Sequence, residues 1–279
     1  MEKISPDLEI LRAWSSLPPL RGDLVFCASA GTERELVALG FPVFSPEELR
    51  VQALDLWSLN YRSWYTYALK RARSCAFLAA GELDELPTKL RANLLKEQVK
   101  VGSGAVLGGR WMSAAHWAGL SDSERVEHLR KWHRRNDAAG GYPVYRPAVL
   151  SAEARASLEN SGLFYLLNRY APRSGPNCFA AALEWASGGR RGWQQLWLHP
   201  EPFLRGLQAE GFKTTRGLAR AGDVLVVRKQ RKPVHAAVLV DSEWIFEKPG
   251  QDFYEPYRLL PRKDFARDWP GARVEAYRR

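Results

Sequence analysis

The chain has 279 residues, of which 46% are hydrophobic and 26% charged, and its formal net charge at pH 7 is +10. This composition is typical of a folded globular protein and excludes a wholly disordered chain. No run of about 18 uncharged apolar residues occurs, which excludes a segment that spans a bilayer. The positive charge would attract an anionic polymer, such as nucleic acid or a cell-wall polymer, through a basic surface.

The first residues and the cysteine content predict a cytosolic protein with reduced thiols. Glu2, Asp7 and Glu9 stand where a secretory signal needs a positive start and an apolar core. The three cysteines are too few and too scattered for a disulfide framework or a zinc site, and we expect no metal or organic cofactor. We therefore expect a chain that is cytoplasmic as synthesised and would leave the cell only by a non-classical route.

The first half of the chain is predicted to be mixed but mainly helical. Asp23 to Ser29 is expected to form a short buried strand, and a helix is expected from Thr32 to Gly40. Ser45 and Glu48 form a capping box at the start of a helical stretch that we extend to residue 80. The aromatic residues of this stretch are expected to pack in a core. Their spacing is partly helical.

A domain boundary is predicted near the middle of the chain. A second capping box, Ser121 with Glu124, opens a helix that leads into a segment with two adjacent glycines and two prolines, 138–147. We therefore predict an N-terminal domain of unknown role over residues 1–147 and a second domain over residues 148–279.

The second half is predicted to place helices first and strands afterwards. Helices are expected over Ser151–Ala171, from Cys178 to Gly188, and over Pro200–Gly211. A meander of antiparallel strands is then expected, which together with the helices is an α+β layout. The expected strands are Asp223–Lys229, Val234–Asp241, Glu243–Pro249 and Glu255–Leu260.

Cys178 is the candidate nucleophile, because it stands where a helix is expected to begin. A cysteine attacks a carbonyl as its thiolate, which the positive end of a helix stabilises. Pro176 and Asn177 set a turn directly before it, and the N–H groups of a first helical turn can bind a developing oxyanion. Cys27 and Cys75 are expected to be buried packing residues, the usual role of a lone cysteine.

His235 is the candidate base, since it lies in a predicted strand that would hold its imidazole rigidly. Glu247 follows 12 residues later, where the chain has room to turn and come back beside that strand. A carboxylate in this place would fix the imidazole tautomer and stabilise its charged form. Asp241 and Asp252 are alternatives for this third role.

The order of these features resembles the NlpC/P60 papain-like superfamily of cysteine peptidases and amidases. The resembling features are a cysteine at a helix N-terminus, a turn at Gly222-Asp223 into a strand, a strand histidine and a polar residue on the next strand. With a glutamate as the third catalytic residue, the arrangement resembles the CHAP amidase branch of this superfamily. The resemblance covers about residues 158–260 and says nothing of the first 150 residues.

The resemblance implies a papain-like fold for the second domain and hydrolysis of an amide, often in a peptide of peptidoglycan. Cys178 would be the nucleophile, His235 the base and Glu247 its orienting partner. Family members also often place a polar residue near the oxyanion. The candidates for this substrate or oxyanion role are Tyr165, Tyr170 and Asn177.

Two other classes of function stay open at this level. One is a non-catalytic module that holds a polyanion or a protein partner, with His235 satisfied by a backbone carbonyl and Glu247 paired with Lys248 or Arg258. The other is an acyl or amine transferase, which would use the same acyl-enzyme chemistry. Oligomeric state and actual substrate do not follow from the sequence.

Overall fold

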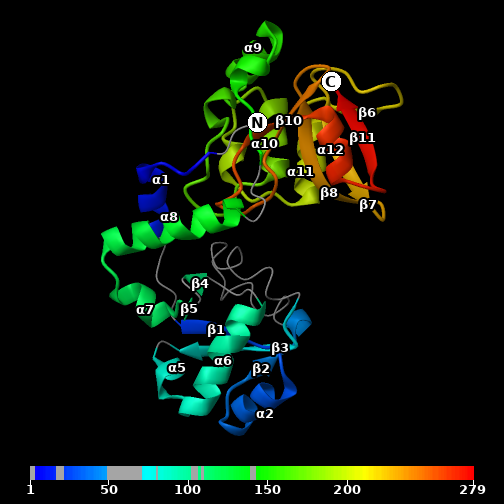
Figure 1. The fold of residues 1–279 in the computed structure, drawn as a ribbon. Helices are drawn as coiled ribbons and strands as arrows, with labels where there is room; N and C mark the ends of the chain where they lie inside the picture. The colour runs from blue at the N-terminus through cyan, green and yellow to red at the C-terminus, as the bar shows by residue number, and fades with distance from the viewer. Residues whose placement is uncertain are drawn as a thin grey trace. The chain divides into compact units, whose positions relative to one another are not determined.

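The computed structural model describes residues 4–16, 22–48, 71–79, 81–101, 106–107, 110–138 and 143–279. The chain divides into two compact units, Asp7–Asn136 and a second unit formed by Met1–Pro6 with Asp137–Arg279. Residue 147, the predicted end of the first domain, falls inside the second unit. Both units combine helices with antiparallel sheets (Figure 1), so the α+β class is confirmed. Over the described residues, no helix is long and apolar enough to cross a bilayer.

The first unit is built around a three-stranded antiparallel sheet in the order β1-β3-β2. Every residue of β1, Gly22–Cys27, is buried, and its outer edge is covered by Gln98 of helix α6, Thr88–Val101. The Gln98 amide accepts a hydrogen bond from Phe26 N and donates one to Phe26 O, both at 2.9 Å, so a side chain satisfies the backbone groups that an edge strand leaves open. The other elements are α1 Leu8–Ser15, α2 Ala30–Ala38, β2 Val43–Phe44, β3 Ser74–Ala79, α5 Glu82–Glu85, β4 Val106–Leu107, β5 Arg110–Trp111, α7 Ala114–Gly119 and α8 Asp122–Ala138.

Several local predictions for this unit are confirmed. The expected first strand is β1 and the following helix is α2. Both capping boxes form: Ser45 N donates to the Glu48 carboxylate at 2.8 Å, and Ser121 N donates to Glu124 at the same distance. The helical stretch expected after Ser45 and its aromatic cluster fall mostly on residues 49–70, outside the described residues.

The extension of that helical stretch to residue 80 is wrong. Ser74–Ala79 is strand β3, which pairs with β1 and β2 and lies between them in the sheet. This short apolar run is compatible with either a helix or a strand, and its two strand neighbours decide the outcome. Its Cys75 is completely buried, as expected for a packing cysteine.

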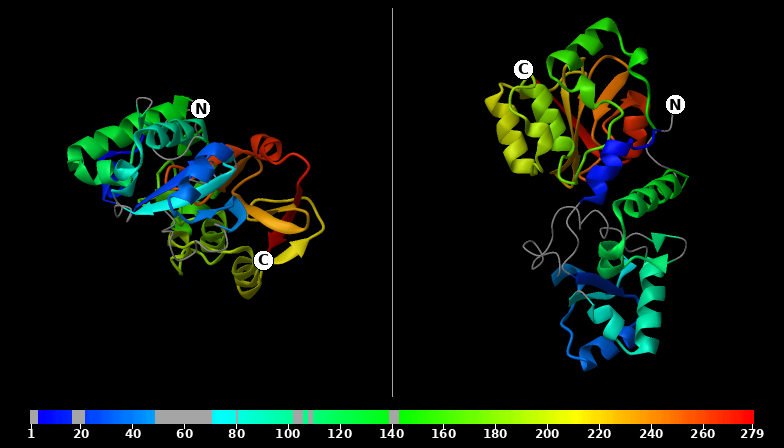
Figure 2. Two further views of the ribbon diagram at one scale, coloured as in Figure 1. Left: turned by 90° about the horizontal axis from the view of Figure 1, so that it is seen from below. Right: turned by 90° about the vertical axis from the view of Figure 1, so that its left-hand side faces the viewer.

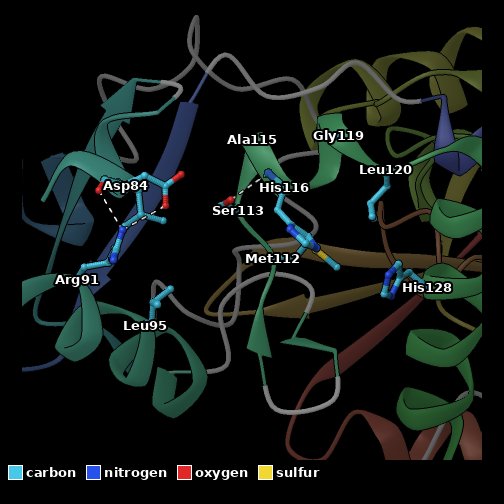
Figure 3. Close-up of a pocket in the computed structure, with 11 residues that line it drawn as sticks. Asp84, Arg91, Leu95, Met112, Ser113, Ala115, His116, Gly119, Leu120 and His128 are labelled. Carbon is cyan, nitrogen blue, oxygen red and sulfur yellow. Dashed lines mark hydrogen bonds and ion pairs between the residues drawn. The ribbon is translucent and has the colours of Figure 1, made fainter. Parts of the chain in front are cut away.

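A cavity of about 790 Å³ lies in the first unit (Figure 3). Its wall combines apolar and ionisable side chains from α5, α6, α7 and α8. Arg91 is fixed there because it donates to the backbone carbonyl of Asp84 at 2.9 Å, and its guanidinium lies 3.6 Å from the Asp84 carboxylate. None of the predicted catalytic residues lines this cavity. The lining includes Leu83, Leu95, Met112, His116 and His128.

The second unit contains a six-stranded antiparallel sheet in the order β10-β9-β8-β7-β11-β6. Helices α10 and α11 lie on one side of this sheet and α12 on the other (Figure 2). The strands are β6 Lys213–Thr215, β7 Val224–Lys229, β8 Lys232–Leu239, β9 Trp244–Glu247, β10 Arg258–Pro261 and β11 Arg273–Arg278. The helices are α9 Ala152–Asn160, α10 Cys178–Ala186, α11 Pro200–Ala209 and α12 Arg262–Asp268, with short 3-10 turns at Pro147–Val149, Phe164–Leu166 and Trp193–Gln195.

Strand alternation gives this sheet two buried faces. Ala236, Val238 and Phe246 belong to the core cluster that includes the apolar side of α10. Ala237 and Ile245 point the opposite way, into the cluster around Phe265 of α12. Since successive side chains of a strand point to opposite faces, the position of each residue in its strand decides which layer it reaches.

The predicted strands and the helices that begin at Cys178 and Pro200 are confirmed, whereas the helix expected over Ser151–Ala171 is shorter. Helix α9 ends at Asn160, and Gly162 adopts a positive φ of 68° that a continuing helix does not allow. Strands β6 and β11 and helix α12 were not predicted. Their sequences are rich in charged residues, which hides the apolar pattern.

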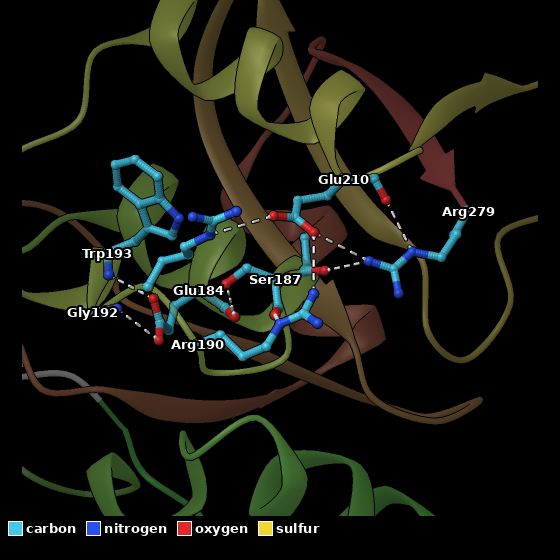
Figure 4. Close-up of polar contacts among 9 residues, drawn as sticks. Glu184, Ser187, Arg190, Gly192, Trp193, Glu210 and Arg279 are labelled. Carbon is cyan, nitrogen blue, oxygen red and sulfur yellow. Dashed lines mark hydrogen bonds and ion pairs between the residues drawn. The ribbon is translucent and has the colours of Figure 1, made fainter.

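The loop after α10 is fixed by a buried carboxylate. Glu184 is 2% exposed and accepts hydrogen bonds from the backbone N–H groups of Gly192 and Trp193 (Figure 4). Close by, Glu210 lies within 4.0 Å of three guanidinium groups and neutralises one of their three charges. These groups belong to Arg190, Arg191 and Arg279.

Candidate active site

Cys178 is the first residue of α10, as the sequence predicts. Asn177 has extended backbone angles and caps the helix, because its side chain accepts a hydrogen bond from Ala180 N at 3.0 Å. The first N–H groups of a helix have no intrahelical partner, so those of Cys178 and Phe179 are available to an anion at this end. The Cys178 side chain is 6% exposed.

The turn before Cys178 is tied to two other loops. Gly175 N donates to Gln251 O at 2.9 Å, and Phe253 N donates to the Ser174 hydroxyl at 3.1 Å. On the other side, the Asn177 amide donates to Leu198 O at 2.8 Å. The nucleophile candidate is therefore held by contacts on both sides of its backbone.

His235 lies on β8 directly after a β-bulge. The register between β7 and β8 pairs Val227 with His235 but Arg228 with Pro233, so Val234 is the extra residue. Bulges of this kind redirect the neighbouring side chain. The imidazole is 1% exposed and stacks on Trp269 with ring centroids 4.9 Å apart.

Glu247 of β9 meets the His235 ring. The β8–β9 register pairs Val238 with Phe246, which places Glu247 diagonally across from His235 on the same face. His235 Nε2 lies 2.7 Å from Glu247 Oε2. Since Nε2 is occupied by the carboxylate, Nδ1 is the ring nitrogen left for another partner, and Cys178 is close enough to raise the pKa of the ring.

Arg258 holds the second oxygen of the same carboxylate. It lies directly opposite Glu247 on β10, and its Nε and Nη2 lie 2.8 and 2.6 Å from Glu247 Oε1. Arg258 Nη2 also lies 3.5 Å from the carboxylate of Asp268 on α12. Glu247 thus pairs with the base candidate and with Arg258 at once, so these two interpretations of its role are not exclusive.

The ionisation of this buried group follows from its partners. Burial disfavours the imidazolium, but the charge and hydrogen bond of Cys178, together with those of Glu247, raise the pKa of His235 to about 10. Burial likewise disfavours the carboxylate, yet His235 and then Arg258 lower the pKa of Glu247 to about 2. Near neutral pH the site therefore holds an imidazolium and a carboxylate.

We expect the His235–Glu247 pair to give a bell-shaped pH dependence of stability. The pKa of His235 is raised from 6.5, so its contribution is complete below pH 6.5 and is lost as the pH rises towards 10. The pKa of Glu247 is lowered from 4.5, so its contribution is complete above pH 4.5 and is lost as the pH falls towards 2. Urea unfolding measures the free energy of unfolding of the wild type and of a His235→Gln/Glu247→Gln variant. The wild type should exceed the variant by the largest amount between pH 4.5 and pH 6.5, where both contributions are complete. A difference independent of pH would contradict this ionisation scheme.

Lys248 is a buried cation for which the sequence predicts no catalytic role. Its side chain is fully buried, and Nζ donates to Gly250 O at 3.0 Å and to Asp252 O at 2.8 Å. It therefore holds the loop that contacts the turn before Cys178. Burial lowers the pKa of Lys248, while Glu255, Asp252 and Cys178 oppose this effect through their charges. The signal in the sequence is a lysine directly after an apolar strand.

The three oxyanion candidates form hydrogen bonds elsewhere in the fold. The exposed Tyr165 accepts a hydrogen bond from Gln194 at 3.2 Å, and the Tyr170 hydroxyl donates to Ile4 O at 3.1 Å. The amide group of Asn177 caps α10 and binds Leu198 O. A role for these side chains at the oxyanion stays a prediction.

The two alternative third members also have other contacts. Asp241 accepts from the backbone N–H groups of Glu243 and Trp244, both at 2.8 Å, and so forms the turn between β8 and β9. Asp252 accepts from the Tyr254 hydroxyl at 2.9 Å. The structure brings Glu247, and neither aspartate, to the ring of His235.

No protein-family model, no curated protein and no solved structure matches this chain. In the part of the chain that the structure describes, no cluster of three or more His, Cys, Asp or Glu side chains is arranged to hold a metal ion.

Proposed function

We propose that the protein is a cysteine-dependent amide hydrolase with a papain-like domain of the NlpC/P60 type. One observation carries the proposal: the buried His235 ring lies 2.7 Å from Glu247 through Nε2, and Cys178, the first residue of a helix, raises the pKa of the same ring. A nucleophile, a base and a group that orients the base are the parts that acyl transfer requires.

The proposed reaction begins with the Cys178 thiolate paired with the His235 imidazolium. The sulfur forms a bond to the amide carbonyl carbon, and the N–H groups of Cys178 and Phe179 stabilise the negative oxygen that results. The imidazolium gives its proton to the leaving nitrogen as the C–N bond breaks, leaving an acyl group on sulfur. A water then attacks this thioester, gives its proton to the neutral imidazole, and releases a carboxylic acid and the thiolate.

The substrate class we propose is a peptide amide, with a cell-wall peptide as the first one to test. This assignment rests on the resemblance in residue order, and the net charge of +10 suits an anionic polymer as a partner.

An activated ester tests the proposal without knowledge of the natural substrate. Incubation with p-nitrophenyl acetate should transfer one acetyl group to the protein, and peptide mapping by mass spectrometry should locate it on Cys178. Acetylation spread over lysines, with Cys178 unmodified, would overturn the proposed mechanism.

A further inference from the structure

Lys248 connects the strand that carries Glu247 with the turn that leads to Cys178. It is the residue directly after Glu247 in the chain, and its side chain is completely buried. Burying a charged group costs free energy, and an apolar side chain of similar volume fills such a space at no such cost. The position therefore calls for an explanation in terms of the charge and its hydrogen bonds, and space filling alone does not supply it.

The ammonium group of Lys248 organises the loop that follows it. Nζ donates to Gly250 O at 3.0 Å and to Asp252 O at 2.8 Å, so two carbonyl groups of one short loop converge on it. The centroid of the Tyr257 ring lies 5.7 Å from Nζ, within reach of a cation–π interaction. Glu255 closes the loop, because its carboxylate accepts a hydrogen bond from Asp252 N at 3.1 Å. The shape of this loop thus depends on the ammonium group.

The loop in turn holds the segment directly before Cys178. The backbone carbonyl of Gln251 accepts a hydrogen bond from Gly175 N at 2.9 Å. Phe253 N donates to the Ser174 hydroxyl at 3.1 Å. Both contacts come from loop residues that are next in the chain to a carbonyl bound by the ammonium group. A displacement of the loop would therefore move the turn from which α10 begins.

The charge of Lys248 also acts on the Cys178 thiolate. Against the lowering effect of burial, the negative charges of Glu255, Asp252 and Cys178 raise the pKa of Lys248. Electrostatic coupling between two groups is reciprocal, so the ammonium group favours the thiolate as much as the thiolate favours the ammonium group. The sulfur is thus coupled to two cations, Lys248 and the imidazolium of His235.

We propose that Lys248 is a positioning residue for Cys178, which fixes the turn before the nucleophile through the 250–253 loop and favours the thiolate by its charge. The inference rests on the proposed function, because it adds a residue to the same site. The end of one strand then supports both halves of the site. Glu247 orients the base, and the next residue orients the nucleophile.

A neutral substitution separates the charge of Lys248 from its hydrogen bonds. Lys248→Gln keeps N–H donors for the loop carbonyls but removes the positive charge. Alkylation of Cys178 by iodoacetamide is followed from pH 3 to 9, over the range in which circular dichroism shows a folded chain. The pH of half-maximal rate should rise by about one unit in this variant, because a nearby buried charge no longer favours the thiolate. The matched control is Lys263→Gln, which removes an equal charge from an exposed position of α12 and should keep the wild-type midpoint.

A second pair of variants tests the hold on the turn and does not depend on the folding of Lys248→Gln. Ser174→Ala removes the hydroxyl that accepts from Phe253 N. Ser187→Ala removes another buried serine, at the opposite end of α10. Acetylation of Cys178 by p-nitrophenyl acetate should be about tenfold slower in Ser174→Ala, because a small displacement of a reacting group lowers the rate strongly. The rate should be unchanged in Ser187→Ala.

The possible outcomes separate the positioning role from the proposed function. A wild-type midpoint in folded Lys248→Gln, or acetylation of Ser174→Ala at the wild-type rate, would overturn the positioning role and leave the proposed function intact. If Lys248→Gln does not fold, Ser174→Ala decides alone. Alkylation of wild-type Cys178 no faster than that of Cys27 at neutral pH would overturn the proposed function and the positioning role together.

Discussion

Cys178→Ala is expected to abolish the formation of acetyl-enzyme from p-nitrophenyl acetate and to reduce turnover by on the order of 10⁶-fold, the loss that follows removal of a catalytic nucleophile. The other two cysteines cannot replace it. Burial raises the pKa of Cys27 to about 11 and that of Cys75 to about 12, so both are protonated thiols at neutral pH.

The fold should survive this substitution, because alanine is a good helix former and Cys178 is the first residue of α10. Circular dichroism and urea unfolding of Cys178→Ala provide that control. A Cys27→Ala variant should lose stability but keep its acetylation at Cys178, since Cys27 belongs to the core of the other unit. Wild-type turnover in Cys178→Ala would end the proposed mechanism.

Arg258→Met is expected to lower the free energy of unfolding by about 3–5 kcal/mol, because it leaves a buried carboxylate without one of its two cationic partners. Arg258 is 5% exposed and Glu247 is 3% exposed, so water cannot replace the lost contact. Urea unfolding at neutral pH measures the loss. The matched control is Arg267→Gln, whose side chain is 75% exposed and should change stability by less than about 0.5 kcal/mol.

A double-mutant cycle shows whether the loss comes from the Glu247 contact. Glu247→Gln removes the charge that Arg258 neutralises, so the double variant should lose less stability than the sum of the single variants. Additive losses would show that Arg258 acts through Asp268 or through packing instead, and would contradict the assigned pairing.

The candidate site could be predicted from sequence because its parts follow local rules. A turn, an N-cap asparagine and an apolar helix mark the position of Cys178, and two strands 12 residues apart bring Glu247 back to His235. Arg258 and Lys248 were harder to place. Whether a charged residue near a strand end is buried depends on the register and on loops that fold over it, and sequence periodicity does not give either one.

The fold could be predicted where the apolar pattern of the sequence is strong. The prediction failed where pairing between distant strands decides the structure. The strands β7, β8 and β9 are apolar runs bounded by turn residues, and the structure confirms them. The apolar run of β3 is compatible with a helix, and only pairing with β1 and β2 makes it a strand. Strand β11 carries alternating charges because ion pairs such as Arg228–Glu275 lie on one of its faces.

The most direct test of the central claim is the rate of alkylation of each cysteine by iodoacetamide from pH 5 to 9, in the wild type and in His235→Ala. Mass spectrometry follows Cys27, Cys75 and Cys178 separately. If Cys178 and His235 form a thiolate–imidazolium pair, Cys178 alone should react rapidly at pH 5 to 6 and should lose this advantage in the variant. If Cys178 reacts no faster than the two buried cysteines, or equally fast without His235, the catalytic pair does not exist.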